Sequence, residues 1–423
     1  MNRYNVLLDS SNISCKPNSI LSSQVFNYLT RNGHTIVRNP SFADYIFINT
    51  CGFDDKNEGI TTALYEAYRK KRKDGAKIVS IGCLNLINVS LQPSWPELLF
   101  ISDLSALDDI FYNTVRYSAI DEAYLDEGNL PLLAASSQRA YDAPGKASYQ
   151  VGEAVKYLGK KLAPGGMKTV RVIEKMHSQN RFYVEIGRGC VSQCSYCIIK
   201  KARGKLHSRG IDQILKDIET SMVPDQKLCL VADDCGCYGF DIGETIFSLV
   251  RAIHQEHPSL EIDLCYVNPA WLEKHEEEYV ALFREAPISG VNIPVQTGSD
   301  RVVTLMNRKY GIENVRRIVG RLREASPRTV IYTHIIVGFP GEEEADFEKT
   351  LPMIELFDFL LFFAYSDREG TPSASMDGKV PERVKKRRLR KVRLKIYQEL
   401  FKMVARDFSG AIMPGSRAKS LSG

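Results

Sequence analysis

The feature that most constrains this chain is a set of three cysteines in the segment Gly189-Cys190-Val191-Ser192-Gln193-Cys194-Ser195-Tyr196-Cys197. The segment directly follows an apolar stretch that we expect to be a β-strand, so the three thiols share one tight loop. Three thiolates at this spacing can ligate three irons of a [4Fe-4S] cluster, and the lack of a fourth nearby cysteine leaves one iron open to a small-molecule ligand. A zinc-binding loop is the alternative interpretation, but zinc would require a fourth Cys or His close by.

With the aromatic residue Tyr196 before its last cysteine, this loop resembles the hallmark of the radical S-adenosylmethionine (SAM) enzymes. The resemblance implies that SAM binds the open iron held by Cys190, Cys194 and Cys197. It also implies that an electron from the cluster cleaves SAM to methionine and a 5′-deoxyadenosyl radical, which abstracts a hydrogen atom from the substrate. The protein then positions the cofactor and excludes side reactions. A flavodoxin- or ferredoxin-like electron donor is the partner that such chemistry implies.

Three further cysteines, Cys15, Cys51 and Cys83, each lie just past a predicted strand. A lone cysteine after a strand is most often a small buried hydrophobe. Parallel strands, however, end at one edge of a sheet, where ligands bind, so these three thiols can converge on one site. Together with the run Asn49 to Phe53 and gaps of 36 (51 − 15) and 32 (83 − 51) residues, they resemble the signature of the methylthiotransferase branch of radical-SAM enzymes. That resemblance implies a second [4Fe-4S] cluster and a transferase that inserts sulfur or a methylthio group at an unactivated C–H bond.

The resemblance extends over about residues 3 to 400, and it suggests which residues contact SAM. At the end of a strand, Gly338 and Gly341 would let the backbone approach a ligand closely, although a turn that merely needs glycine is the alternative. By family likeness we expect SAM contacts at Val337, Gly338 and Phe339. The likeness further suggests Asp234 for the SAM amino group, and Gln296, Ser299 and Arg308 for its ribose and carboxylate. No catalytic residue is identified, and Cys229, Cys235, Cys237 and Cys265, which match no ligand position, are predicted to be structural.

The order of predicted elements indicates an α/β fold with two main domains. Residues 1–140 alternate short strands with helices, which favours a parallel, helix-covered, flavodoxin-like sheet that carries the second cluster. Residues 141–180 are predicted to be a linker. Residues 181–407 contain six strand–helix units, which indicates a partial (β/α)6 barrel with its reactive site at the carboxyl ends of the strands. Its last helix is basic and is predicted to present a solvated face, and residues 408–423 form a tail.

The chain departs from its apparent relatives at three places. They carry a small all-β docking domain after the barrel, whereas about sixteen residues (423 − 407) follow the basic helix here, too few for such a domain. Either the sequence stops short of that domain or the substrate is bound by other means. The chain also has Lys200 where relatives have proline, and Asp233-Asp234-Cys235 where they have Gln-Asp-Thr.

These departures favour a peptide or small-molecule substrate over RNA. The alternatives are a tRNA adenosine methylthiotransferase, and a radical enzyme that transfers sulfur without methylation or uses the second cluster only for electrons. From a different class, a metal-stabilised RNA-binding or assembly protein would use its cysteines only to staple loops.

Composition and charge add little to the cysteine patterns. The 423 residues are 44% hydrophobic and 25% charged, as in ordinary globular proteins, and the net charge of +5 is a weak argument for nucleic-acid binding. The start has no leader pattern, and no apolar run reaches the ~20 residues of a membrane span. We therefore expect a cytoplasmic protein without a membrane partner, in which clustered cysteines serve metals and not disulfides.

Overall fold

The computed structural model describes residues 3–133, Val172 and residues 180–412. The predicted linker, residues 141–180, lies almost wholly outside the described residues, as does most of the predicted tail. The chain forms two compact units. The first contains the described residues up to 133, residues 180–266 and Ser366–Ser375, and the second contains residues 267–365 and those from Met376 onward.

The first unit begins with a five-stranded parallel sheet in the order β2-β1-β3-β4-β5. This order places β1, β3 and β4 side by side, so their carboxyl ends are neighbours at one edge. The strands are β1 (Asn5–Ser10), β2 (Thr35–Ile36), β3 (Tyr45–Thr50), β4 (Lys77–Gly82) and β5 (Leu98–Phe100).

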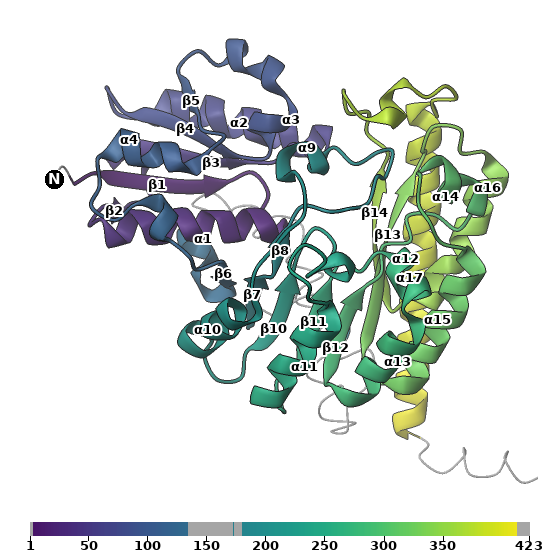
Figure 1. Ribbon diagram of the computed structural model, residues 1–423. Coiled ribbons are helices and arrows are strands. Elements are labelled where there is room, and N and C mark those ends of the chain that lie inside the picture. The colour runs from purple at the N-terminus through teal and green to yellow at the C-terminus, as the bar shows by residue number, and fades with distance from the viewer. Residues whose placement is uncertain (1–2, 134–171, 173–179, 413–423) are drawn as a thin grey trace, which may run out of the picture. The chain divides into compact units, whose positions relative to one another are not determined.

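Helices cover both faces of this sheet because its central strands are apolar on both sides (Figure 1). Val6 and Leu8 of β1 pack in a core with Val25 of α1 (Lys16–Arg31), whereas the intervening Leu7 packs in a second core with Tyr65 of α2 (Asp55–Lys71). Alternate side chains of a strand point to opposite faces, so this division is that of a doubly wound sheet. The predicted flavodoxin-like arrangement is therefore present.

The first unit also contains three parallel strands of the predicted barrel, β7 (Arg181–Glu185), β10 (Lys227–Val231) and β11 (Ile262–Cys265), with β10 in the middle. The short strand β6 (Tyr124–Asp126) joins β7 in the antiparallel direction, and the sequence did not predict it. Between these strands lie α9 (Ile199–Arg203), α10 (Ile211–Ser221) and α11 (Ile246–Glu256).

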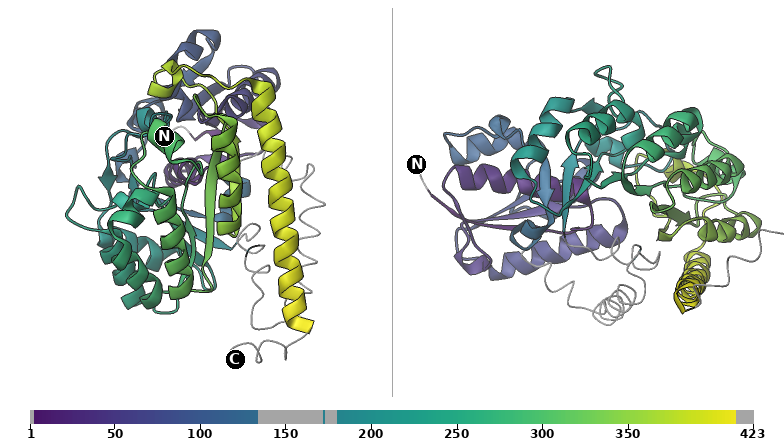
Figure 2. Two further views of the ribbon diagram at one scale, coloured as in Figure 1. Left: turned by 90° about the vertical axis from the view of Figure 1, so that its right-hand side faces the viewer. Right: turned by 90° about the horizontal axis from the view of Figure 1, so that it is seen from below.

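The second unit contains the other three predicted barrel strands, β12 (Ile288–Asn292), β13 (Val330–Val337) and β14 (Phe359–Ala364), all parallel. The long helix α17 (Glu382–Ile412) runs beside β14, as Figure 2 shows. Leu389, Val392 and Ile396 of α17 pack onto β13 and β14. The remaining helices of this unit are α12 (Pro269–Lys274), α13 (Glu276–Glu285), α14 (Asp300–Leu305), α15 (Ile312–Ala325) and α16 (Glu344–Thr350).

The basic side chains of α17 differ from the prediction of a solvated face. Lys385 and Arg388 are buried, at 7% and 3% exposed. Arg388 forms an ion pair of 2.7 Å with the buried Glu342, and the Lys385 ammonium donates to the carbonyl of Tyr365 at 2.9 Å. Buried basic groups require such partners, so these two residues fasten α17 to the loop after β13, and only the rest of the basic run remains near solvent.

The six predicted barrel strands are thus present among the described residues, three in each unit, and the predicted α/β class is confirmed. In the part of the chain that the structure describes, none of the helices is both long and apolar enough to cross a membrane.

Candidate metal centres

Cys15, Cys51 and Cys83, here called the N-terminal cysteine site, follow the three adjacent strands β1, β3 and β4. Cys51 and Cys83 come immediately after their strands, while Cys15 ends the loop after β1 and caps the N-terminus of α1. Cys51 and Cys83 are only 2% and 6% exposed. The structure therefore brings these dispersed cysteines to one sheet edge, as the sequence predicted.

Gly82 explains how Cys83 approaches the neighbouring strand so closely. Its φ of +95° is a conformation that side chains strongly disfavour, and a Cβ there would lie 2.6 Å from the carbonyl oxygen of Thr50. The amide of Cys83 donates to that same Thr50 carbonyl at 3.1 Å. A glycine before Cys83 is thus what lets this cysteine lie against the end of β3.

Amide side chains surround the buried thiols of this site. The Nδ2 of Asn12 donates to the Sγ of Cys51 at 3.4 Å, and the Sγ of Cys83 donates to the Oδ1 of Asn18 at 3.3 Å. Asn49 joins the end of β3 to α1, because its Nδ2 donates both to the carbonyl of Asn18 and to Ser22 at 2.8 Å. Sequence reasoning did not assign these asparagines a role.

Electrostatics shows that the three thiols lie within reach of one another. Burial, together with the neighbouring Cys83 and Cys51, raises the pKa of Cys15 to about 12. Burial also raises the pKa of Cys51 and of Cys83, while the Arg203 guanidinium lowers that of Cys83. Buried thiols with high pKa values resist ionisation in the absence of a cation, so this pocket suits a metal group that replaces the thiol protons.

Cys190, Cys194 and Cys197, here called the loop cysteine site, lie between the two-residue strand β8 (Gly187–Arg188) and α9. The loop is braced from within, since the amide of Cys197 donates to the carbonyl of Cys194 at 3.2 Å. Cys190 and Cys194 are partly exposed and Cys197 is exposed. These thiols are therefore more accessible than Cys51 and Cys83.

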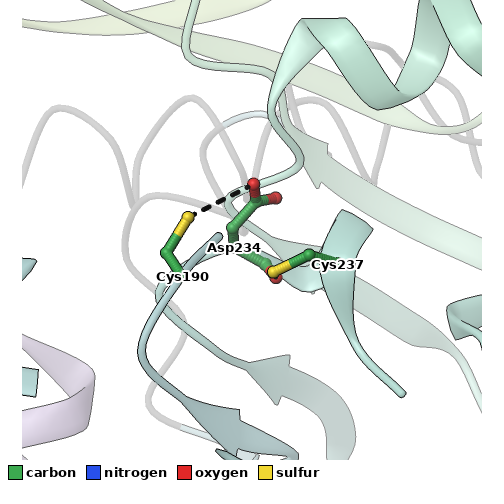
Figure 3. Close-up of side chains that lie close together, drawn as sticks. All are labelled: Cys190, Asp234 and Cys237. Atoms are coloured by element: carbon green, nitrogen blue, oxygen red, sulfur yellow. Dashed lines mark hydrogen bonds between the residues drawn. The ribbon is translucent and has the colours of Figure 1, made fainter. Parts of the chain in front are cut away.

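Asp234, predicted to bind the SAM amino group, follows β10 and faces the loop cysteine site (Figure 3). The Sγ of Cys190 lies 3.7 Å from its Oδ2. Cys237, which the sequence analysis treated as structural, lies beside them. The Sγ of Cys237 donates to the carbonyl of Asp234 at 3.2 Å, and its interaction with Cys190 is the largest cause of the lowered pKa of Cys190. Cys237 is 47 residues (237 − 190) from Cys190, and no motif links the two.

The spacing of the thiols distinguishes a cluster from a single ion. Among the described residues, the one trio of potential ligands whose donor atoms all lie within 4.8 Å of each other is Cys190, Asp234 and Cys237. Thiolates on one tetrahedral zinc are about 3.8 Å apart, given Zn–S bonds of about 2.3 Å. Neither predicted cysteine trio is gathered that tightly. Each thiolate of a [4Fe-4S] cluster binds a different iron, so the wider spacing fits a cluster.

The other predicted SAM contacts are divided between the two units. Tyr196 is half-buried in the loop of the first unit, and Gln296, Ser299 and Arg308 belong to the second. Ser299 donates to Asp346 at 2.7 Å, and Arg308 donates to the carbonyl of Pro294 at 2.9 Å.

Gln296 has two features expected of a ligand-binding residue. Its φ of +64° is unusual for a residue with a side chain. Its buried Oε1 has no hydrogen-bond partner among the described residues. A buried acceptor of this kind is costly unless a ligand supplies a donor.

At the end of β13, side chains of the chain itself occupy the space that Gly338 provides. Val337 and Phe339 are fully buried. Gly338 has a φ of +78°, and a Cβ there would meet the side chain of Lys385. Its amide donates to Glu342 at 2.5 Å. Among the described residues, a turn that needs glycine is enough to explain why Gly338 is a glycine. SAM contacts at Val337, Gly338 and Phe339 remain predictions.

Comparisons with known proteins agree with this geometry. Residues 184–354 match the family model described as the Radical SAM superfamily, and residues 10–90 match the Uncharacterized protein family UPF0004. The chain is 32% identical over 385 residues to the ribosomal protein uS12 methylthiotransferase RimO of Thermosipho africanus, covering 89% of this chain and 80% of the relative. It belongs to the radical-SAM methylthiotransferase family.

Other relatives support the same assignment, and one solved structure shares the fold. The RimO of Syntrophotalea carbinolica is 31% identical, with 90% of this chain and 78% of that relative covered. The threonylcarbamoyladenosine tRNA methylthiotransferase MtaB of Thermotoga maritima is 29% identical, with 89% and 78% covered. The structure of the radical SAM methyltransferase TsrM from Kitasatospora setae is similar in fold, with a TM-score of 0.54, 13% identity, and 88% and 77% coverage.

As a member of this methylthiotransferase family, the chain is a transferase, and the cofactors of the family are SAM and two [4Fe-4S] clusters. The metal-ligating residues present fit those clusters, because each of two regions offers three thiols in loops that follow strands. The family relatives are named for a ribosomal protein and for a tRNA nucleoside, so the expectation of a small-molecule or free peptide substrate is not supported, and the tRNA alternative stays open.

Proposed function

We propose that this chain is a methylthiotransferase with two clusters. The cluster held by the loop cysteine site would initiate the radical reaction, and the cluster held by the N-terminal cysteine site would supply the sulfur. Cys190, Cys194 and Cys197 would hold the cluster that binds SAM, and Cys15, Cys51 and Cys83 would hold the second cluster. The observation that carries this proposal is the convergence of Cys15, Cys51 and Cys83, from three separate strands, at one buried edge.

When bound, the two clusters and SAM supply electron transfer, a carbon radical and a sulfur atom, and the chain itself provides binding and orientation. Asn12 and Asn18 contact thiols of the N-terminal cysteine site through their amides. Asp234 accepts from Cys190 and caps the turn after β10 by accepting from Gly236 at 3.1 Å. We propose Asp234 as a SAM contact of the first unit. Within the second unit, we propose Gln296 as a ligand-binding residue through its unsatisfied amide oxygen.

Iron content and SAM cleavage test this assignment in two matched triple variants. Cys15→Ala/Cys51→Ala/Cys83→Ala should bind about four irons instead of about eight and still form 5′-deoxyadenosine. Cys190→Ala/Cys194→Ala/Cys197→Ala should also bind about four irons but form none. Four irons in the wild type, or zinc in place of iron, would contradict the two-cluster assignment. Iron without SAM cleavage would favour the loop-stapling, non-enzymatic alternative.

The product assay uses the two substrate classes named for the relatives. Wild-type enzyme with SAM and reductant is offered either the uS12 protein or tRNA carrying threonylcarbamoyladenosine. Peptides and nucleosides are then weighed, and a methylthio group is expected on one of them. A thiol without the methyl would indicate sulfur transfer alone. An unmodified substrate with intact SAM cleavage would indicate that the second cluster carries only electrons or that another substrate is used.

A further inference from the structure

A continuous chain of polar contacts connects the two cysteine sites within the first unit. The amide of Gly189, which precedes Cys190, donates to the Oδ2 of Asp233 at 2.8 Å. The Oδ1 of Asp233 lies 3.9 Å from the Nε of Arg203, whose Nη2 donates to the Oδ1 of Asn18 at 3.2 Å. That same Asn18 oxygen accepts from the Sγ of Cys83. Arg203 is the charged group at the centre of this connection.

Arg203 is a buried cation, which is costly unless negative charge lies nearby. Only 8% of its side chain is exposed. Burial opposes its charged form, yet Cys83 and Asp233 raise its pKa, so the guanidinium stays protonated. Its buried Nε has no hydrogen-bond acceptor among the described residues, although Asp233 lies close enough for a weak ion pair. A donor in this state is oriented for an acceptor that the protein does not itself provide.

A second buried arginine near the site makes a useful contrast. Arg368 lowers the pKa of Cys51, but two carboxylates of α2 face it, Glu58 at 2.7 Å and Asp55 at 3.2 Å. Its charge is therefore compensated locally. Arg203 has Asp233 at 3.9 Å and the more remote Glu185, with no carboxylate as close as those of Arg368 among the described residues, so more of its positive charge acts on Cys83 and Cys15.

We propose that Arg203 and Asp233 form a charged pair that sets the reduction potential of the cluster bound by Cys15, Cys51 and Cys83, with Arg203 raising it and Asp233 lowering it. This inference rests on the proposed function, because it requires a cluster at the N-terminal cysteine site. One-electron reduction makes the cluster more negative, so a nearby buried cation stabilises the reduced form and a carboxylate destabilises it. Arg203 is thus a positioning and tuning residue, not a catalytic one.

The negative charge of Asp233 is what distinguishes this pair from an isolated arginine. A neutral glutamine at position 233 could not offset the charge of Arg203. With an aspartate there, the chain holds the cluster at a lower potential than a glutamine would. The Asp233 carboxylate also accepts from the amide of Gly189, just before Cys190. One charged group therefore contacts the loop and also faces Arg203 beside the N-terminal cysteine site.

The test measures the potential of the N-terminal cluster alone, in the full chain with Cys190→Ala/Cys194→Ala/Cys197→Ala as background. Three single substitutions are compared after anaerobic reconstitution, by redox titration monitored with electron paramagnetic resonance. Arg203→Gln should make the midpoint more negative by at least tenfold in the reduction equilibrium constant, which is about 59 mV for one electron. Asp233→Asn should shift it in the opposite direction. Lys216→Gln removes an exposed charge of α10 and should leave it unchanged.

Opposite shifts in the two variants support the proposal, and unchanged or parallel shifts overturn it. If Arg203→Gln fails to hold the cluster, Arg203→Lys keeps the charge and should retain a near-wild-type potential, while Asp233→Asn still tests the sign. A background protein that binds no iron at Cys15, Cys51 and Cys83 would instead refute the proposed function. A bound cluster that ignores both substitutions refutes only this inference.

Discussion

The two cysteine sites reach similar ligand sets by opposite routes. The loop cysteine site takes all its thiols from one segment of eight residues, 190 to 197, whose bracing contact joins Cys197 to Cys194. The N-terminal cysteine site takes one thiol from each of three strand ends, and it exists only when the sheet is formed. A local site depends on spacing, whereas a dispersed site depends on the packing that aligns its strands.

This difference has a consequence for how the protein acquires its clusters. Cys190 and Cys194 are partly exposed residues and Cys197 is an exposed one, so the loop can be approached from outside, even though burial raises the pKa of the Cys197 thiol to about 11. Cys51 and Cys83 are buried in the folded sheet, so local opening near the ends of β3 and β4 is expected to precede delivery there. The dispersed site should therefore be the slower one to load and to lose iron.

The largest expected effect is in thiol reactivity of the cluster-free protein at pH 7. Burial raises the pKa of Cys15 to about 12, whereas that of Cys190 is lowered from its ordinary value. The thiolate is the form that reacts, and at pH 7 a smaller fraction of Cys15 than of Cys190 is ionised. This outweighs the greater nucleophilicity of the more basic Cys15 thiolate, so iodoacetamide should modify Cys190 at least about 50-fold faster than Cys15. Peptide mass spectrometry over time measures both rates. Equal rates would show that the N-terminal cysteine site is open in solution.

A stability measurement sharpens the claim that the dispersed site depends on the scaffold. Asn49→Ala removes the buried amide that joins β3 to α1, leaving the Asn18 carbonyl and Ser22 without that donor. The free energy of unfolding should fall by about 2 kcal/mol, and iron at the N-terminal cysteine site should fall with it. Urea denaturation and iron counting measure both quantities.

At the loop cysteine site, the substitution to compare with Asn49→Ala is Lys200→Ala. It removes the hydrogen bond from the Lys200 ammonium to the carbonyl of Ser192 at 3.0 Å. Because that contact lies within one partly exposed loop, the unfolding free energy should change by less than about 1 kcal/mol. If Lys200→Ala destabilises the chain more than Asn49→Ala, the contrast between local and dispersed sites is wrong.

The sequence predicted most of the fold because its strands carry strong apolar patterns. For example, the apolar runs at residues 77–82 and 329–337 predict strands, and β4 and β13 agree with those bounds within a residue. It missed β6, since three residues that pair with β7 in the antiparallel direction leave almost no periodic signal. It also placed Lys385 and Arg388 toward solvent, because composition cannot show that a distant Glu342 would pair with one of them.

The candidate sites were predictable to the extent that their residues share a motif. The thiol spacing indicated both cysteine trios, whereas it gave no indication of a role for Arg203. The contacts of Arg203 with Asn18 and Asp233 depend on three separate elements, so no local pattern contains them. Cys237 was interpreted as structural for the same reason, since only the fold brings it to Cys190.

The smallest expected effect concerns Cys237, which lies beside Cys190 of the loop cysteine site. Cys237→Ala removes the thiol whose interaction lowers the pKa of Cys190, so Cys190 of the cluster-free protein should react with iodoacetamide about fivefold more slowly at pH 7. Cys235→Ala is the control, because the Sγ of Cys235 donates instead to the carbonyl of Cys265 at 2.6 Å. An unchanged rate in Cys237→Ala would mean that the loop sets the reactivity of Cys190 on its own. The loop cysteine site would then be entirely local, and the contrast with the dispersed site would be sharper still.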